Sequence, residues 1–438
     1  MIYITIDLNT IYSNHQLLKQ TINETLYDHK IQKDIINIII SYYLDIRLIS
    51  NEKAYALLSP DGTINTWGLS CYGGDSSSEQ HLLKNIIDIK STVTAFSALT
   101  ENGNVIAWGE AQTGGYCINK QHELQNIKSI HAVLDCSFVA IRNNGSLISW
   151  GSKNLGNCET LVDDVKYIYS NGSNTFVAIT SEGNGYISES SKIIGSNFIP
   201  CSEVQDQLTN ISTIYHNRYS YTALKQDGSI VTWGDCKFGG NSSLVADKLK
   251  NVISIAPTAG AYIALLQNGT IVSWGYMNWR YLTNPLIYVQ DKLHDIIKIY
   301  STNTSYLALT KTGSVVTWGC RDTGGDCGIY QELLVNIVDI YANFNSFLAI
   351  RDDDTVITWG SVLYANGCVI KRENDKIVSV HKTLKSFAIL YKSGSVVIIG
   401  NSEKTYYDIE SVISCHNAYM FIKKNGMLEI KKIPLKKF

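Results

Sequence analysis

The sequence lacks the features that mark several common classes of protein. Only five of its 438 residues are proline and no long Ser/Gly tract occurs, which argues against disordered linkers. Charged residues make up 17% of the chain and the formal net charge is -2, so no basic face for nucleic acid is expected. The N-terminus has no basic segment followed by an apolar core, and the apolar run Ile35 to Leu44 is too short to span a membrane. We therefore expect an intracellular protein without nucleic-acid or membrane partners.

Signatures of catalysis and of cofactor binding are also missing. The chain has no Gly-Lys step of a phosphate-binding loop, no His-Glu-x-x-His and no Gly-x-Ser-x-Gly. The acidic run Asp352 to Asp354 falls where a hairpin turn is expected, and we interpret it as a solvated turn rather than a cation site. The sequence therefore predicts a protein that is not an enzyme, with no catalytic residue, no cofactor and no metal ligand.

The cysteines do not form a disulfide framework. Cys117, Cys158, Cys327 and Cys368 each follow a tryptophan by eight or nine residues, and no Cys-x-x-Cys pair occurs. Equivalent positions in different repeats should lie beyond the roughly 7 Å Cα separation that a disulfide tolerates. We expect reduced cysteines that are buried as small apolar side chains.

A repeated Trp-Gly dipeptide dominates the sequence. Successive copies lie 41 to 44 residues apart, except for one step of 83 residues that contains a degenerate copy. The seven tryptophans are Trp67, Trp108, Trp150, Trp233, Trp274, Trp318 and Trp359. A period of this length indicates a repeat protein, in which each copy buries its apolar face against its neighbours.

Each repeat reads as three strands followed by a loop. In one copy, Ile296–Tyr300, Ser305–Leu309 and Ser314–Trp318 are β-branched or alternating segments. An X-Gly turn separates the second and third strands in most copies, which is the strongest hairpin signal in the chain. The second strand repeats an aromatic residue followed by alanine, and a Gly pair often closes the loop after Trp-Gly. A fourth segment is left open, either one helical turn or an edge strand.

This pattern resembles the regulator of chromosome condensation repeat, and it is similar to the short version found in the propeller-type β-lactamase inhibitor. The segments Ser229–Gly234 and Ser314–Gly319 carry the likeness, which extends from about Ile46 to Ile430. The resemblance implies an all-β fold, a β-propeller of about 40-residue repeats with seven or more blades around a central channel. The best-known members have seven blades, whereas this chain offers up to ten hairpins. We assign residues 45–438 to the propeller and expect it to be monomeric.

Residues 1–44 differ from the repeats, and we predict a short N-terminal helical segment. Apolar residues in its second half follow helical spacing, at Ile31, Ile35, Ile38, Ile39 and Tyr42. With Asp34, this stretch resembles the start of an F-box, although the usual Leu-Pro before the acidic residue is absent. The favoured interpretation is an amphipathic helix that packs on the propeller.

Two sets of residues are candidates for binding. The first set lies in the loops after Trp-Gly, which vary most between copies and contain the residue types that dominate interfaces. Its members are Tyr72, Lys237, Phe238, Trp279, Arg280, Tyr281 and Arg321. The second set lies at the end of the first strand of each copy. These residues either form a binding ring at one mouth of the channel or pack between the blades. The members of the second set are His131, Tyr169, Tyr215, Tyr300, Tyr341 and His381.

The leading interpretation is a non-enzymatic scaffold that binds a protein partner of unknown identity. Three alternatives follow from the resemblances. They are guanine-nucleotide exchange on a small GTPase, substrate adaptor for ubiquitin ligation through the F-box-like N-terminus, and propeller-type enzyme inhibitor.

Overall fold

The structure, a computed structural model, describes residues 46–133, 137–152, 162, 164–171, 176–188, 198–276, 282–284, 289–361, 367–400, 403–425 and 427–432. The predicted helical segment 1–44, with its F-box-like stretch, lies outside the described residues. So do three of the candidate binding residues, Trp279, Arg280 and Tyr281.

Ten antiparallel sheets make up the described structure, and we number them as blades in chain order. Blades 1 to 4 have three strands each. Blade 1 contains β1 (Arg47–Ser50), β2 (Ala54–Leu58) and β3 (Ile64–Gly68), and blade 2 contains β4 (Ile86–Ser91), β5 (Ala95–Thr100) and β6 (Val105–Gly109). Blade 3 contains β7 (Ile127–Val133), β8 (Ser137–Arg142) and β9 (Leu147–Gly151), and blade 4 contains β10 (Val165–Ser170), β11 (Phe176–Thr180) and β12 (Gly185–Ile187). Blades 5 to 7 are β13 (Phe198–Ile199) with β14 (Ile211–His216), β15 (Ser220–Lys225), β16 (Ile230–Asp235); β17 (Val252–Pro257), β18 (Ala261–Leu266), β19 (Ile271–Gly275); β20 (Leu282–Asn284) with β21 (Ile296–Ser301), β22 (Ser305–Thr310), β23 (Val315–Cys320). Blades 8 to 10 are β24 (Ile337–Ala342), β25 (Ser346–Arg351), β26 (Val356–Gly360), β27 (Cys368–Ile370); β28 (Ile377–Lys382), β29 (Phe387–Tyr391), β30 (Val396–Ile399), β31 (Lys404–Tyr406); β32 (Ile409–Ser414), β33 (Ala418–Lys423), β34 (Leu428–Lys432).

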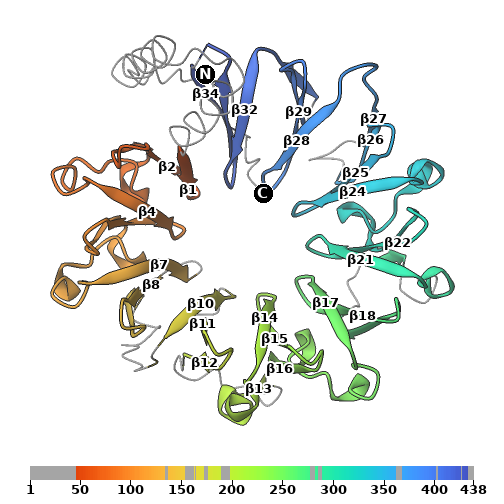
Figure 1. The fold of residues 1–438 in the computed structure, drawn as a ribbon, viewed down its shortest axis with the longest axis horizontal. Coiled ribbons are helices and arrows are strands. Elements are labelled where there is room, and N and C mark those ends of the chain that lie inside the picture. The colour runs from red at the N-terminus through yellow and green to blue at the C-terminus, as the bar shows by residue number, and fades with distance from the viewer. Residues whose placement is uncertain are drawn as a thin grey trace, which may run out of the picture.

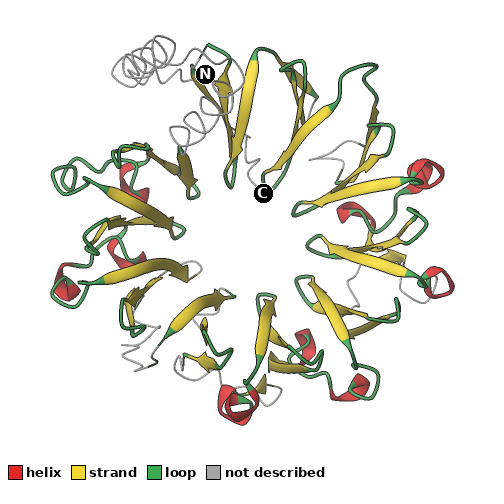
Figure 2. Ribbon diagram, viewed as in Figure 1, coloured by secondary structure: helices red, strands yellow, loops and turns green. Residues whose placement is uncertain are grey.

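The blades stand side by side in a ring, so the fold is an all-β propeller (Figure 1). The prediction of seven or more blades is confirmed, and the ten sheets exceed the seven of the best-known propellers of the resembled family. Outward from the centre of the ring, the strands of blade 5 follow the order β14, β15, β16 and β13, and those of blade 8 the order β24, β25, β26 and β27 (Figure 1). The first, second and third strands of a blade are counted in this outward order. The turn between the first and second strands points toward the centre, and we call it the tip of the blade (Figure 2).

The segment that the sequence left open takes both predicted forms. Four blades gain a fourth strand, namely β13, β20, β27 and β31. Most connections contain 3-10 helices: η1 (Ser70–Tyr72), η2 (Ala111–Thr113), η3 (Ile118–Lys120), η5 (Cys201–Glu203), η6 (Gln205–Gln207), η7 (Cys236–Phe238), η8 (Ser243–Val245), η10 (Gln290–Lys292), η11 (Arg321–Thr323) and η12 (Gly328–Leu333). None of the helices in the described part of the chain is both long and apolar enough to cross a membrane.

The core consists of apolar layers between adjacent blades rather than one central mass. One layer combines Leu307 and Leu309 of blade 7 with Phe347 and Ala349 of blade 8. Within a blade, the aromatic residue of the second strand lies opposite the tryptophan of the third, as Tyr306 does with Trp318. Those two rings stack with centroids 5.5 Å apart. The repeated aromatic, alanine and tryptophan are therefore core residues.

Two of the eight described cysteines, Cys117 and Cys327, are buried in this core as expected, whereas Cys71 is exposed and the other five are half-buried. All eight described cysteines are free, as the sequence predicted, and Cys158 lies outside the described residues. The Cys327 thiol donates to Gln331 Oε1 at 2.9 Å, and Ser76 makes the same contact with Gln80 in blade 1 at 3.1 Å. Burial raises the pKa of the Cys117 thiol to about 11, which keeps it protonated and unreactive.

Candidate partner-binding surface

A Gly pair follows four of the Trp-Gly dipeptides, and each of these pairs joins one blade to the next. The indole Nε1 of Trp108 in blade 2 donates to the carbonyl oxygen of Gly73 in blade 1 at 3.0 Å. The same hydrogen bond runs from Trp150 to Gly114, from Trp274 to Gly239 and from Trp359 to Gly324, each at 3.1 Å. At Gly114 the backbone has a φ of 99°, and a Cβ there would lie 2.6 Å from the Phe138 ring. The Gly pair is therefore structural, and we call this contact the tryptophan hydrogen bond.

Tyrosines of the second strand make another contact between blades. Where this position is tyrosine, its hydroxyl contacts the tip of the preceding blade. Tyr262 contacts Asn217 N at 3.1 Å, and Tyr306 contacts Thr258 Oγ1 at 3.0 Å. The same holds for Tyr221 with Asn171, Tyr419 with Ser386 and Tyr55 with Asn417. Burial raises the pKa of the Tyr55 hydroxyl to about 12, so it stays protonated as a donor.

The last residue of the tip pairs with the last residue of the 3-10 helix that follows Trp-Gly. In blades 2 and 7 both residues are threonine, and their hydroxyls lie 2.6 Å apart at Thr94–Thr113 and 2.7 Å apart at Thr304–Thr323. In blade 1 the pair is Lys53 and Tyr72, in which the ammonium lies 4.6 Å from the ring centroid. In blade 5 it is Tyr219 and Phe238, whose rings stack with centroids 4.3 Å apart. Two threonines are therefore sufficient to brace a tip, and we call these residues the brace pair.

The brace pair of blade 5 belongs to a larger exposed group. The Phe238 ring meets the Tyr276 ring edge-on at 6.1 Å, and Lys237 Nζ lies 4.6 Å from the Tyr276 centroid. Tyr219 is 42% exposed and Lys237 is exposed, while Phe238 and Tyr276 are half-buried. We call Tyr219, Lys237, Phe238 and Tyr276 the aromatic cluster.

The backbone beneath the aromatic cluster is held firmly. The carbonyl oxygen of Phe238 accepts hydrogen bonds from Asn217 Nδ2 and from Ser220 Oγ, both at 2.8 Å. Gly239, the next residue, accepts the tryptophan hydrogen bond from blade 6. The Asp235 side chain accepts from the Lys237 N–H at 2.9 Å and caps η7. The cluster is therefore a preformed surface on a rigid junction.

The structure separates the first set of predicted binding residues. Lys237 and Phe238 are neighbours in blade 5, whereas Tyr72 follows blade 1 and the exposed Arg321 follows blade 7. The described members therefore do not form one continuous surface. Sequence reasoning missed Tyr219 and Tyr276, which complete the cluster. The signal for Tyr219 is its position at a tip, where blades 2 and 7 carry threonine.

The second set of predicted residues lies on the first strands, and its four tyrosines pack against the apolar layers between blades. All six side chains are half-buried. Tyr300, on the first strand of blade 7, packs against the layer shared by blades 7 and 8, and Tyr341 packs against the next layer. Their role in binding stays a prediction.

The two histidines of this set are neutral side chains that bond within their own strands. His131 Nε2 lies 3.0 Å from Ser129 Oγ, and His381 Nε2 lies 2.9 Å from Ser379 Oγ. Burial lowers the pKa of His131 to about 4, with Lys90 adding to the effect. Neither ring is charged at neutral pH, so these two positions add no positive charge to the centre.

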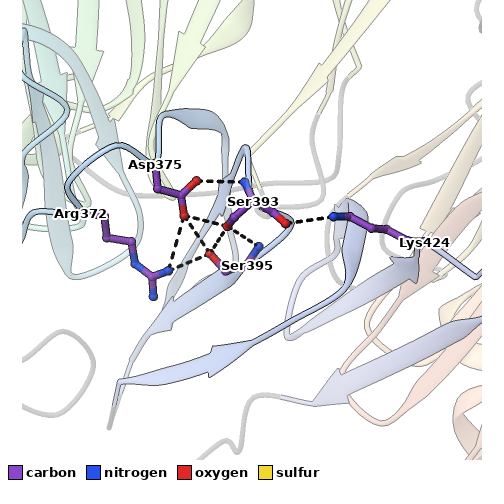
Figure 3. Close-up of polar contacts among 5 residues, drawn as sticks. All are labelled: Arg372, Asp375, Ser393, Ser395 and Lys424. Carbon is purple, nitrogen blue, oxygen red and sulfur yellow. Dashed lines mark hydrogen bonds and ion pairs between the residues drawn. The ribbon is translucent and has the colours of Figure 1, made fainter.

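At the hairpin turn of blade 9, a polar network links the connection between blades 8 and 9 to blade 10 (Figure 3). The Asp375 carboxylate accepts from Ser393 N at 2.9 Å and from Ser393 Oγ at 2.7 Å. Arg372 Nη1 donates to Ser395 Oγ at 2.7 Å, and Lys424 Nζ of blade 10 donates to Ser393 O at 2.9 Å. Burial would raise the pKa of Asp375, but the hydrogen bonds from the serines and the nearby Arg372 outweigh it and lower that pKa.

This network is structural. Other blades close the same turn with their own Asp or Asn, as Asp227 does by accepting from Ser229 N at 2.9 Å. In blade 9 the equivalent turn position is Ser393, and the carboxylate that accepts the hydrogen bonds of the turn belongs to Asp375. The acidic run in blade 8 is also a turn, in which Asp353 accepts from Thr355 N and pairs with Lys371. No group of three or more potential metal-ligating side chains occurs among the residues that the structure describes.

No protein-family model and no curated protein matches the sequence. Solved structures with a similar strand arrangement include Prp20p from Saccharomyces cerevisiae, at 13% identity and a TM-score of 0.32, over 91% of this chain and 95% of that one. The CRINKLY ectodomain of the Arabidopsis thaliana receptor kinase ACR4 matches at 14% identity and a TM-score of 0.32, over 63% and 95%. The computationally designed Ika8 protein matches at 10% identity and a TM-score of 0.33, over 80% and 96%. At this level of similarity the propeller assignment stands on the ten sheets themselves.

Proposed function

We propose that this chain is a non-enzymatic β-propeller that binds a protein partner through the aromatic cluster. The observation that carries the proposal is the contrast among brace pairs. Blades 2 and 7 brace their tips with two threonines, so the packing of the ring does not require the exposed ring of Tyr219 or the half-buried ring of Phe238. Exposed aromatic groups beside a cation, on a rigid backbone, are typical of the residues that dominate binding energy at interfaces.

The experiment replaces the blade 5 brace pair with the pair that blades 2 and 7 already use. The double variant Tyr219→Thr/Phe238→Thr keeps a brace and removes the aromatic surface. The matched control is Lys53→Thr/Tyr72→Thr in blade 1. Tagged proteins are used to capture partners from the cells in which the chain occurs, with quantitative mass spectrometry. We expect one set of partners with the wild type and the control, and a loss of at least tenfold with the blade 5 variant. Equal recovery by all three proteins would contradict the proposal.

The other functions stay alternatives. Nucleotide exchange, ubiquitin-ligase adaptor and enzyme inhibition all require a partner surface, and no contact among the described residues selects one of them. The F-box-like stretch lies outside those residues. If the captured partner is a small GTPase, a nucleotide-release assay with the blade 5 variant separates exchange from simple binding.

A further inference from the structure

The cations at the aromatic cluster have no acidic partner in the described part of the chain. Lys237 and Arg218, which precedes Tyr219 at the same tip, are both exposed. Neither forms an ion pair there, whereas Lys90 pairs with Asp88 at 3.0 Å and Lys371 with Asp353 at 3.0 Å. The nearest carboxylate in sequence, Asp235, is turned to the backbone N–H of Lys237. Lys237 of the cluster and the adjoining Arg218 are thus two exposed cations without an ion pair among the described residues, in a chain whose formal net charge is -2.

We propose that the aromatic cluster recognises a short acidic peptide segment that also carries an aromatic side chain. This inference rests on the proposed function and names the chemistry of the partner. A ligand ring can stack on the outer face of Tyr219, since Tyr219 and Phe238 already form a stacked pair at 4.3 Å. Ligand carboxylates supply the counter-charge that Lys237 and Arg218 lack, and an arginine fork suits a bidentate carboxylate contact.

The distribution of charge favours a peptide over a nucleic acid. A single-stranded nucleic acid needs a basic track that follows several phosphates, in addition to rings on which bases stack. The cluster offers one cation, Lys237, and the adjoining tip of blade 5 offers one more, Arg218, whereas the neighbouring described tip of blade 6 is Thr258-Ala259-Gly260, without charge. A compact ligand with one or two carboxylates beside a ring fits this surface better than a phosphate chain.

The test uses a phage-displayed library of random twelve-residue peptides selected on the full-length protein. We expect enrichment of sequences with two or more Asp or Glu within four residues of Trp, Tyr or Phe. Labelled copies of an enriched peptide should bind at least tenfold more weakly to Tyr219→Thr/Phe238→Thr. The control Lys53→Thr/Tyr72→Thr should bind as the wild type does. Thermal melting of each variant checks that it remains folded.

A charge-reversed protein makes the test specific. Selection on Arg218→Glu/Lys237→Glu should enrich Lys or Arg beside the aromatic residue instead of Asp or Glu. Neutral or basic peptides enriched on the wild type would overturn the acidic assignment, even if partner capture still depends on the aromatic pair. Tighter binding of a labelled oligothymidine than of any enriched peptide would also overturn it, in favour of nucleic acid. Enrichment of no peptide would overturn the inference, while the capture experiment judges the proposed function separately.

Discussion

The junction of blades 5 and 6 and the junction that closes the ring share one contact and differ in another. At the junction of blades 5 and 6, Tyr262 contacts the preceding tip and Trp274 donates to Gly239. At the closing junction, Tyr55 of blade 1 donates to Asn417 of blade 10 at 3.0 Å, across 362 residues of sequence. Trp67 of blade 1, however, is only half-buried, and its Nε1 has no hydrogen-bond partner among the described residues.

The difference shows what holds the two ends together. Blade 1 is built from β1–β3 and blade 10 from β32–β34, so neither end adds a strand to the sheet of the other. The two blades instead share an apolar layer in which Tyr55 and Leu57 meet Ala418 and Met420. Closure therefore depends on packing and one tyrosine contact. We expect it to be stabilised less than the junction of blades 5 and 6, which has both contacts.

The largest difference in stability between the internal and closing junctions is expected when a tryptophan side chain is removed. Trp108 is 2% exposed, and Trp108→Ala should lower the free energy of unfolding by about 3–5 kcal/mol, the usual cost of deleting a buried large aromatic residue. Trp67→Ala should cost about half as much, because a half-buried side chain loses less apolar contact. Urea denaturation monitored by circular dichroism measures both. Equal losses would show that the closing junction is as well packed as the others.

A smaller effect is expected when the Gly pair is altered. A Cβ on Gly115 would lie 2.4 Å from the backbone carbon of Gly109, so Gly115→Ala should cost about 1–3 kcal/mol through overpacking. The matched control is Gly328→Ala, because a Cβ there meets no atom within 4 Å and only its φ of 52° opposes the change. That control should lose about 1 kcal/mol at most. Thermal melting of the two variants ranks them, and a harmless Gly115→Ala would remove the steric role of the pair.

The tryptophan hydrogen bond itself gives a still smaller difference. Trp108→Phe removes a bonded indole N–H, whereas Trp318→Phe removes one without a partner among the described residues. Both tryptophans are 2% exposed, so the apolar loss is similar. We expect Trp108→Phe to cost about 1 kcal/mol more, the net value of one hydrogen bond. Indistinguishable urea midpoints would mean that this bond does not strengthen the junction.

Much of this fold can be predicted from the sequence because the same pattern of residue types occurs in most of the repeats. The Trp-Gly spacing and the X-Gly turns predicted the blades, and the aromatic and alanine of the second strand are buried in the layers as expected. Blade 9 has Ile399-Gly400 in place of Trp-Gly and still forms a full sheet, because Val396 to Ile399 are buried as the third strands of blades 2, 3 and 8 are.

The candidate surface was less predictable, for a physical reason. Lys237 and Phe238 stand out in a variable loop, but Tyr219 lies nearly twenty residues earlier and becomes part of the cluster only when the tip folds onto η7. Residues equivalent in the repeat, such as Tyr72 and Phe238, lie in different blades rather than on one patch. The repeat period of the sequence shows which residues are equivalent, whereas a binding surface depends on which residues are adjacent in the fold.

The most direct test of the closed ten-blade ring is a double-mutant cycle across its ends. Tyr55→Phe and Asn417→Ala remove the two partners of the closing hydrogen bond, singly and together. Urea denaturation of the four proteins yields a coupling energy, and we expect about 1 kcal/mol because the two side chains contact each other. A coupling energy of zero would contradict the closing contact between blades 1 and 10, on which the closed ring depends together with the shared apolar layer.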